Sequence, residues 1–304
     1  MKNSFESQFV VDLLTTLRKE KFSHLGWWHF FRRSWEMSWN TAQSYPRLKR
    51  SWTHITVFIS ILVIAILLIS FFLEGPGTTI RLLPGFLFCV VWQQSDLFWH
   101  LGLNRQAKTG ELLPTVGVAN TLTWLRGLAA SFLLGRLIGG VSTPSWLALL
   151  VFLAGIMTDI LDGQVARYTR TQSKLGQIAD GEADFYLYSA TAIILIQNGV
   201  LPLWLGLIML LRFLVPLLAA LASYFIFMHP IRFGSTVWGK YAALAQCLYF
   251  FVLLTPPQLV FIARFINLPL LTVTLILLIA APTAQIAKNV LAETRRTPKN
   301  SPSG

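Results

Sequence analysis

The sequence predicts an all-α, polytopic membrane protein built as a bundle of transmembrane helices. Of its 304 residues, 54% are hydrophobic and only 12% are charged, whereas a soluble domain carries about 25% charged residues. The apolar residues gather into stretches of about 20, the length an α-helix needs to cross a bilayer. Cys89 and Cys247 both fall inside such stretches, so we interpret them as small buried apolar residues without a disulfide or metal role.

Eight stretches are candidate spans, and an even number of spans places both termini on the same side of the membrane. They cover residues 53–73, 82–100, 115–137, 144–162, 178–198, 201–226, 238–256 and 262–286. With this assignment 20 of the 25 Lys and Arg residues fall on the side of the termini. Because short loops rich in Lys and Arg stay in the cytoplasm, the termini are predicted to be cytoplasmic, most naturally at a cell inner membrane. The net charge of +12 then reflects orientation and attraction to anionic lipid, with no need for nucleic acid.

Residues 1–52 are predicted to form a cytoplasmic region at the membrane surface. Trp27, Phe31, Trp35 and Trp39 recur every four residues and therefore share one face of a helix. Aromatic side chains on one face, with cations around them, are typical of an interfacial amphipathic helix. A helix that docks a partner or a second copy is the alternative. About 50 polar and basic residues precede the first span, which argues against a cleavable signal peptide.

Two spans, within residues 53–114, come next. The second ends with four polar residues, Gln93, Gln94, Asp96 and His100, and the last two share a helical face at a spacing of four. They are either interfacial residues in contact with water or groups at the edge of a functional site that contact its substrate.

The third span opens with Asn120, Thr123 and Arg126, whose spacing of three forms one helical stripe. Arg126 lies in apolar sequence and needs an anionic or carbonyl partner, because an unpaired Arg is costly inside a membrane. Gly135 and Gly139 form a Gly-x-x-x-Gly pair that permits close approach of another helix.

Four aspartates, Asp159, Asp162, Asp180 and Asp184, dominate the polar content of the fourth and fifth spans. An ionised Asp at the centre of a membrane helix costs roughly 2.5–3.5 kcal/mol, so four of them need compensation. Spacings of three and four place each pair on one helical face, and the short polar connection 168–175 would bring the two faces together. Carboxylate oxygens with access to water suit Mg²⁺ or Mn²⁺, and four carboxylates allow two ions.

Small residues and an arginine accompany the aspartates. Gly163, Gly176 and Gly181 lie in predicted helices, where each glycine costs about 1 kcal/mol relative to Ala, which suggests that a ligand approaches the backbone closely. Arg167 suits a phosphate group. Together these residues indicate a metal-bound nucleotide diphosphate. The alternative is a salt-bridge network between helices, which the sequence disfavours because few bases share the stripes of the four acids.

The segment from Asp159 to Asp184 resembles the complete signature of the CDP-alcohol phosphotransferases. It reads Asp159-x-x-Asp162-Gly163-x-x-Ala166-Arg167, eight residues, Gly176, three residues, Asp180, three residues, Asp184. Two other patterns are similar to that family: Asn120-x-x-Thr123-x-x-Arg126, and Gly239-Lys240 with Gln246, although Ala243 stands where Thr is usual. The resemblance implies a six-span catalytic core over residues 115–290. Two extra spans precede this core, and a disordered cytoplasmic tail, 291–304, follows it.

The resemblance also implies roles for single residues. Asp159, Asp162 and Asp180 would bind metal, and Asp184 would bind metal and act as the catalytic base. The nucleotide would be held by Gly163, Ala166, Arg167 and Gly176, with help from Asn120 and Thr123. A homodimer is implied as well.

The implied reaction transfers a phosphatidyl group from CDP-diacylglycerol to an acceptor hydroxyl, with release of CMP. Arg212 lies in the middle of a span, and Arg232 and Lys240 lie near its cytoplasmic end, so a phosphorylated acceptor such as glycerol 3-phosphate is one expectation. The alternative for Arg232 and Lys240 is that they only anchor loops. A neutral alcohol acceptor, or a soluble CDP-alcohol donor with a lipid acceptor, stays open.

Two other function classes are weaker. A divalent-cation or nucleotide transporter would carry acids in two pseudo-symmetric halves, whereas here one half carries them. A catalytically dead scaffold would be expected to lose at least one signature Asp, and none is lost.

Overall fold

The computed structural model describes residues 5–222, 237–255 and 260–294. These residues form long α-helices and no named strand, which confirms the all-α prediction. The chain divides into two compact units, residues 1–194 and 195–304, and each is described by itself.

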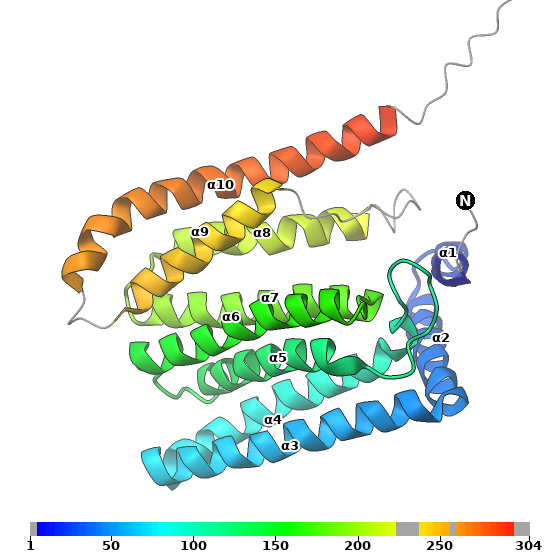
Figure 1. Cartoon of the computed structure of the whole chain (residues 1–304), viewed down its shortest axis with the longest axis horizontal. Helices are drawn as coiled ribbons and strands as arrows, with labels where there is room; N and C mark the ends of the chain where they lie inside the picture. Colours follow the sequence, from blue (N-terminus) through cyan, green and yellow to red (C-terminus); the bar gives the residue numbers. More distant parts are fainter. Residues whose placement is uncertain (1–4, 223–236, 256–259, 295–304) are drawn as a thin grey trace, which may run out of the picture. The chain divides into compact units, whose positions relative to one another are not determined.

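In the first unit, α1 and α2 form the N-terminal region. Their bounds are Phe5–Lys19 and His24–Ser44, and the Ser23 hydroxyl caps α2 by accepting a hydrogen bond from the Gly26 amide at 3.1 Å. Figure 1 shows α2 running across the ends of α3 and α4. The predicted aromatic face packs there: the ring centroids of Trp35 and Phe98 are 5.2 Å apart. Trp35 nevertheless stays 42% exposed, so part of this face remains available to the membrane surface.

Five long helices follow in the first unit, each coinciding with a predicted span. They are α3 (Pro46–Glu74), α4 (Pro76–Trp99), α5 (Gly117–Ile138), α6 (Ser145–Tyr168) and α7 (Lys174–Gln197), with the short helix η1 (Leu101–Leu103) after α4. Figure 1 shows these helices side by side.

The Gly135–Gly139 pair is used between α5 and α4 of the same chain. A Cβ atom at Gly139 would lie 2.2 Å from the carbonyl oxygen of Arg81, and one at Gly135 would lie 2.7 Å from Phe86 Cα. These distances are far below van der Waals contact, so only glycine lets the two backbones approach this closely. At the same end of α5, Arg136 is 2% exposed and its Nη1 atom lies 2.7 Å from a Glu74 carboxylate oxygen.

Helices α6 and α7 contact each other and carry the aspartate segment. The rings of Phe152 and Tyr188 meet edge to face at 5.5 Å, and a Cβ atom at Gly155 would lie 2.5 Å from Leu187. The turn between the two helices is fixed by the loop that follows η1. The Ala107 amide donates to the Gln172 carbonyl at 2.8 Å, and the Lys174 amide donates to the Arg105 carbonyl at 3.0 Å. This clamp fixes the register of the two helices that bear the aspartates.

The second unit contains α8 (Leu203–Ala222), α9 (Val237–Leu254) and α10 (Val260–Thr294). Gln246, fully buried on α9, donates to the Met209 carbonyl of α8 at 3.4 Å. Helix α10 continues to Thr294, so the first four residues of the predicted tail are helical, and residues 295–304 lie outside the described part.

Four helices in the described part are long and apolar enough to span a membrane on composition alone. They are α3, α6, α9 and the Phe265–Ala284 part of α10. Together with the fold, they identify an integral membrane protein. The other long helices, α4, α5, α7 and α8, occupy the remaining predicted spans, so a count of eight crossings stays a prediction.

Candidate active site

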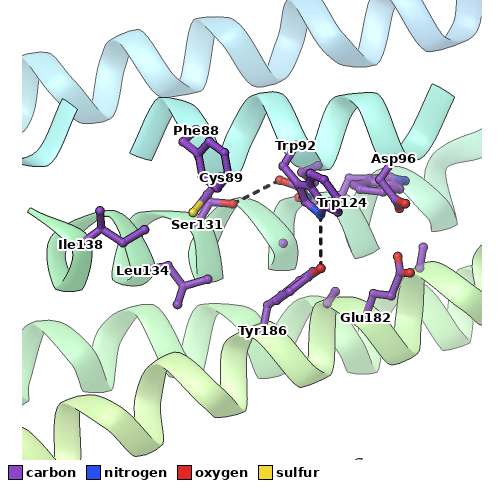
Figure 2. A pocket seen from close by; sticks show the side chains of 14 residues that line it. Phe88, Cys89, Trp92, Asp96, Trp124, Ser131, Leu134, Ile138, Glu182 and Tyr186 are labelled. Carbon is purple, nitrogen blue, oxygen red and sulfur yellow. Dashed lines mark hydrogen bonds between the residues drawn. The ribbon is translucent and has the colours of Figure 1, made fainter. Parts of the chain in front are cut away.

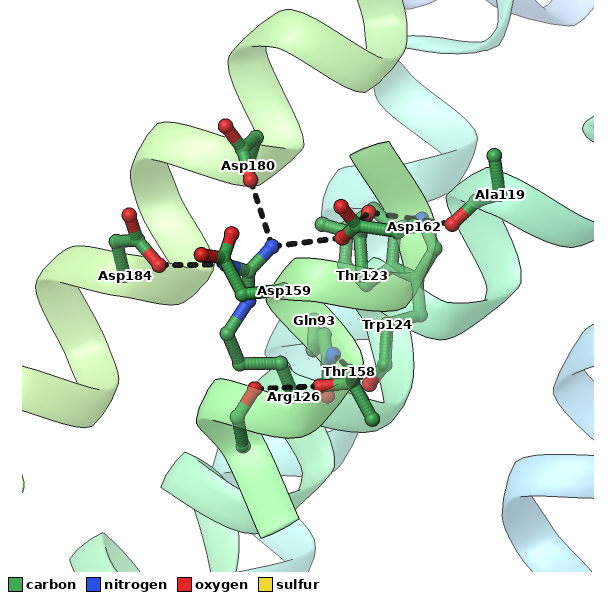
Figure 3. A network of polar contacts seen from close by, with 11 residues as sticks. Gln93, Ala119, Thr123, Trp124, Arg126, Thr158, Asp159, Asp162, Asp180 and Asp184 are labelled. Carbon is green, nitrogen blue, oxygen red and sulfur yellow. Dashed lines mark hydrogen bonds and ion pairs between the residues drawn. The ribbon is translucent and has the colours of Figure 1, made fainter. Parts of the chain in front are cut away.

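The four aspartates converge from α6 and α7, as Figure 3 shows. Asp159 and Asp162 lie on α6, and Asp180 and Asp184 lie one turn apart on α7. Carboxylate oxygens of Asp159, Asp162 and Asp180 all lie within 4.8 Å of one another. The predicted meeting of the two helical faces is therefore present.

Arg126 of α5 lies at the centre of these carboxylates. Its guanidinium is fully buried and contacts all four: Nη1 pairs with Asp159 and, at 2.6 Å, with Asp184, and Nη2 pairs with Asp180 at 2.6 Å and Asp162 at 2.9 Å. The expectation that Arg126 needs an anionic partner is met four times. The salt-bridge network that the sequence disfavoured does exist. Its base, Arg126, comes from a third helix, α5, and was not counted because it lies on neither of the helical faces that carry the aspartates.

The charges at this centre do not balance. Four ionised carboxylates and one guanidinium leave three negative charges. The aspartates are also unequally open: Asp162 and Asp184 are 10% and 25% exposed, but Asp159 and Asp180 are 42% and 49% exposed. The centre is thus closed by α5 on one side and accessible on the other, an arrangement that suits an incoming cationic or cation-bound ligand.

Thr123 orients one of the buried aspartates. Its hydroxyl donates to Asp162 Oδ2 at 2.7 Å, on the same oxygen that receives Nη2 of Arg126. The resemblance assigned Thr123 to the nucleotide; in this structure it acts first on a carboxylate. Two donors on one oxygen fix the direction in which the other Asp162 oxygen points.

Asn120 of α5 and Gly176 of α7 lie against each other. The Asn120 amide nitrogen donates to the Val116 carbonyl at 2.7 Å and to the Ser173 hydroxyl at 3.3 Å. A Cβ atom at Gly176 would lie 2.5 Å from Asn120 Oδ1, so a larger residue would have to displace the Asn120 side chain from these two hydrogen bonds. The ligand-approach explanation is therefore unnecessary for Gly176.

The other small residues face more open surroundings. A Cβ atom at Gly181 would meet nothing within 4 Å, and one at Gly163 would meet only the guanidinium of Arg167, at 3.2 Å. Arg167 is exposed in the last turn of α6, and Ala166 beside it is half-buried. These positions leave room for a ligand to approach.

The polar residues at the end of α4 have two kinds of surroundings: Gln93 and Gln94 bond to neighbouring helices, and Asp96 lines a cavity. Gln93 donates to the Trp124 carbonyl at 2.8 Å, and Gln94 accepts from the Thr56 hydroxyl at 3.0 Å, so both join helices. Asp96 and His100 pair at 3.1 Å, as their spacing predicts.

Sequence reasoning missed Glu182, which lies between Asp180 and Asp184 on α7. Its offset of two residues from each places it on a different face of the helix.

The predicted acceptor residues belong to the second unit. Arg212 of α8 is half-buried, with its guanidinium 4.3 Å from the ring centroid of Phe213, and Lys240 of α9 is exposed. Arg232 lies outside the described residues. Their contact with an acceptor stays a prediction.

Comparison with known proteins gives a match to the CDP-alcohol phosphatidyltransferase family over residues 116–284. The matched region contains every residue of the aspartate centre. A cardiolipin synthase (CMP-forming) from Streptomyces coelicolor is 38% identical over 74 residues, which are 24% of this chain. The chain thus spans about a third of that relative's length, 34%. No solved structure is significantly similar to the chain. The family match covers more than half of the residues, and the chain therefore belongs to the CDP-alcohol phosphatidyltransferase family.

Proposed function

We propose that this protein transfers a phosphatidyl group from CDP-diacylglycerol to the hydroxyl of a polar acceptor, with release of CMP, in phospholipid biosynthesis. The observation that carries the proposal is the convergence of Asp159, Asp162, Asp180 and Asp184 inside the region that matches the family. The membrane setting agrees with it, because the acyl chains of the donor stay in the bilayer while the nucleotide reaches the site from water.

The donor set at this centre fits Mg²⁺ or Mn²⁺. Three carboxylates offer oxygens within 4.8 Å of one another, and the centre has an excess of negative charge after Arg126 is counted. Asp159, Asp162, Asp180 and Asp184 would hold two ions, the number that four carboxylates allow. When bound, such ions stabilise negative charge on a diphosphate during displacement at phosphorus.

The protein's own groups would bind and orient the reactants. Arg167, exposed beside Gly163, is available to a phosphate of the nucleotide, and Ala166 would shape the same surface, whereas Gly176 would contribute by letting α7 approach Asn120. Asn120 and Thr123 would act indirectly: Asn120 holds the turn at Ser173, and Thr123 orients the Asp162 carboxylate.

Asp184 is the proposed base. Its carboxylate is 25% exposed and is held by Arg126 at 2.6 Å, so it is fixed in direction but open to a substrate. It would accept the proton of the acceptor hydroxyl while that oxygen bonds to the phosphorus of the phosphatidyl group. The bond from this phosphorus to the oxygen of CMP then breaks, and CMP leaves with the electron pair.

The finer points of the proposal concern the acceptor and the assembly. A phosphorylated acceptor such as glycerol 3-phosphate would use Arg212, Arg232 and Lys240; transfer from a soluble CDP-alcohol to a lipid is the alternative. The proposed organisation is a surface region, 1–52, two extra spans, 53–114, the catalytic core, 115–290, and a cytoplasmic tail, 291–304. We also propose a homodimer in a cell inner membrane with its active site in the cytoplasm.

The test is CMP release by the purified full chain given CDP-diacylglycerol, Mn²⁺ or Mg²⁺, and a panel of acceptors, with each lipid product identified by mass. Asp184→Asn should reduce release at least a hundredfold, because general base catalysis contributes typically 10²–10⁴-fold. Asp12→Asn is the matched control, because it makes the same chemical change at an exposed position of α1. Equal release by Asp184→Asn and Asp12→Asn would refute the assigned base.

A further inference from the structure

A cavity lies between α4, α5 and α7, and none of the four aspartates lines it (Figure 2). Its volume is about 370 Å³, and its walls are mostly apolar and aromatic, with Phe88, Trp92, Trp124 and Tyr186 among them. Trp92 Nε1 donates to the Tyr186 hydroxyl at 3.3 Å and so joins α4 to α7 across the cavity. The cavity includes residues of an extra helix that precedes the region matching the family.

The cavity has one polar end. Asp96 of α4 and Glu182 of α7 both line it and face each other in Figure 2. Asp96 pairs with His100, and Glu182 is within electrostatic reach of both. The two carboxyl groups lie within hydrogen-bonding reach of each other and share one imidazole, so a proton or a bound cation must compensate the second negative charge. This end favours a cation.

The cavity is long enough for a lipid chain. On α5 it extends from Trp124 to Ile138, a rise of about 21 Å at 1.5 Å per residue. One leaflet of a bilayer has a hydrocarbon thickness of about 15 Å, half of the roughly 30 Å core. Phe88 and Trp92 at its side are 66% and 54% exposed, which leaves the cavity open toward surrounding lipid.

Two further observations place a headgroup at the polar end. A neighbouring hollow, lined by Trp28, Phe31 and Trp35 of the surface helix α2, shares Trp92 and Asp96 with the cavity. Asp96 therefore lies at the level of that surface helix. In addition, Trp124 is 5% exposed and its indole N–H has no hydrogen-bond acceptor among the described residues. An ester or phosphate oxygen of a ligand would satisfy this donor.

We propose that this cavity is an accessory lipid site, which holds one acyl chain of a lipid whose headgroup ends in an ammonium group bound by Asp96 and Glu182. The indole of Trp92 adds a cation–π contact at the same end. The site lies on a different face of α7 from Asp180 and Asp184, so it binds a lipid that is not itself at the metal centre.

Lipid binding to the purified full chain tests this without CDP-diacylglycerol, so the result does not depend on the proposed reaction. The measurement is native mass spectrometry with three lipids that carry the same dioleoyl chains: phosphatidylethanolamine, its N-acetylated form and phosphatidylglycerol. We expect phosphatidylethanolamine to bind at least about tenfold more tightly than the N-acetylated form, because only the former offers a charged donor.

Substitutions separate the headgroup from the chain. Glu182→Gln and Asp96→Asn should abolish the preference for phosphatidylethanolamine, whereas Glu111→Gln, on an exposed loop, should leave it unchanged. Ser131→Phe should weaken all three lipids at least about tenfold by filling the cavity, and Leu150→Phe, at a position that is 58% exposed on α6, should not.

A second readout needs no change in the cavity. Cys89 lines it, and in a Cys247→Ser background it is the one remaining thiol of the sequence. Phosphatidylethanolamine should slow alkylation of Cys89 by N-ethylmaleimide several-fold at concentrations where the N-acetylated lipid does not. Equal affinity for the three lipids, or equal alkylation rates with each of them, would overturn the proposal.

Discussion

Removing the guanidinium of Arg126 should make the stability of this protein depend on a divalent metal. Arg126 is fully buried and pairs with four carboxylates. Arg126→Met keeps an apolar stem of similar length but takes away the counter-charge. The aspartates would then repel one another until protons or a metal ion compensated them, and the unfolding free energy would fall accordingly.

The magnitude follows from how exposed each partner is. Asp159 and Asp180, 42% and 49% exposed, are screened by water and contribute little. Asp162 and Asp184, 10% and 25% exposed, carry most of the effect. Breaking a buried pair by removing one partner costs about 3–5 kcal/mol, whereas a metal ion at a thousand times its Kd restores about 4 kcal/mol. Saturating metal should therefore offset most of the loss.

The assay is thermal unfolding of the detergent-solubilised full chain in EDTA and in saturating Mn²⁺. Arg136→Met is the matched control, since Arg136 lies on the same helix, is 2% exposed and pairs with Glu74 instead of the aspartates. Both variants should unfold at lower temperature than the wild type in EDTA, and Mn²⁺ should raise the unfolding temperature more for Arg126→Met than for Arg136→Met, because only Arg126→Met has lost the other counter-charge of the aspartates. The reasoning is refuted if Arg126→Met unfolds like the wild type in EDTA, or if Mn²⁺ stabilises both variants equally.

Three further predictions concern the frame of the site. Thr123→Val should lower the rate of CMP release about tenfold and raise the Mn²⁺ concentration needed for half-maximal activity, because Asp162 loses a hydrogen-bond donor at 2.7 Å. Thr121→Val is the control, because the Thr121 hydroxyl bonds only to its own helix. Gly176→Ala should cost about 1–3 kcal/mol in unfolding free energy, because its Cβ would lie 2.5 Å from Asn120 Oδ1. At Gly181 a Cβ would meet nothing within 4 Å, so Gly181→Ala should leave the unfolding temperature unchanged or higher. The same variant should reduce CMP release if the nucleotide approaches that backbone. Equal unfolding temperatures for Gly176→Ala and Gly181→Ala would contradict the packing role of Gly176.

The sequence predicted the helices and the aspartate centre because both depend on local periodicity. Apolar stretches of about 20 residues identify long helices, and spacings of three and four residues place Asp159 with Asp162 and Asp180 with Asp184 on single faces. Nothing else is needed to predict that two helices joined by a short turn present four carboxylates together.

Partners on other helices were beyond such reasoning. That Arg126 needed an anion was evident, but its choice of four aspartates depends on how α5 docks against α6 and α7. Gly176 was interpreted as a ligand-approach position because a glycine within a helix has several explanations, and only the 2.5 Å approach to Asn120 Oδ1 selects packing. Glu182 escaped attention since its significance depends on the face of α7 that meets α4, a helix far away in the sequence.

The residues before the family region also contribute to the architecture of the site. The loop after η1 pairs through its backbone with the turn between α6 and α7, where Ala107 and Arg105 bond to Gln172 and Lys174. Gln93 of α4 bonds to the Trp124 carbonyl of α5, two residues before Arg126. The N-terminal part therefore holds both the turn that joins the aspartate pairs and the helix that supplies their counter-ion. A segment that served only as a membrane anchor would need neither contact, which argues that it forms one structural unit with α5, α6 and α7.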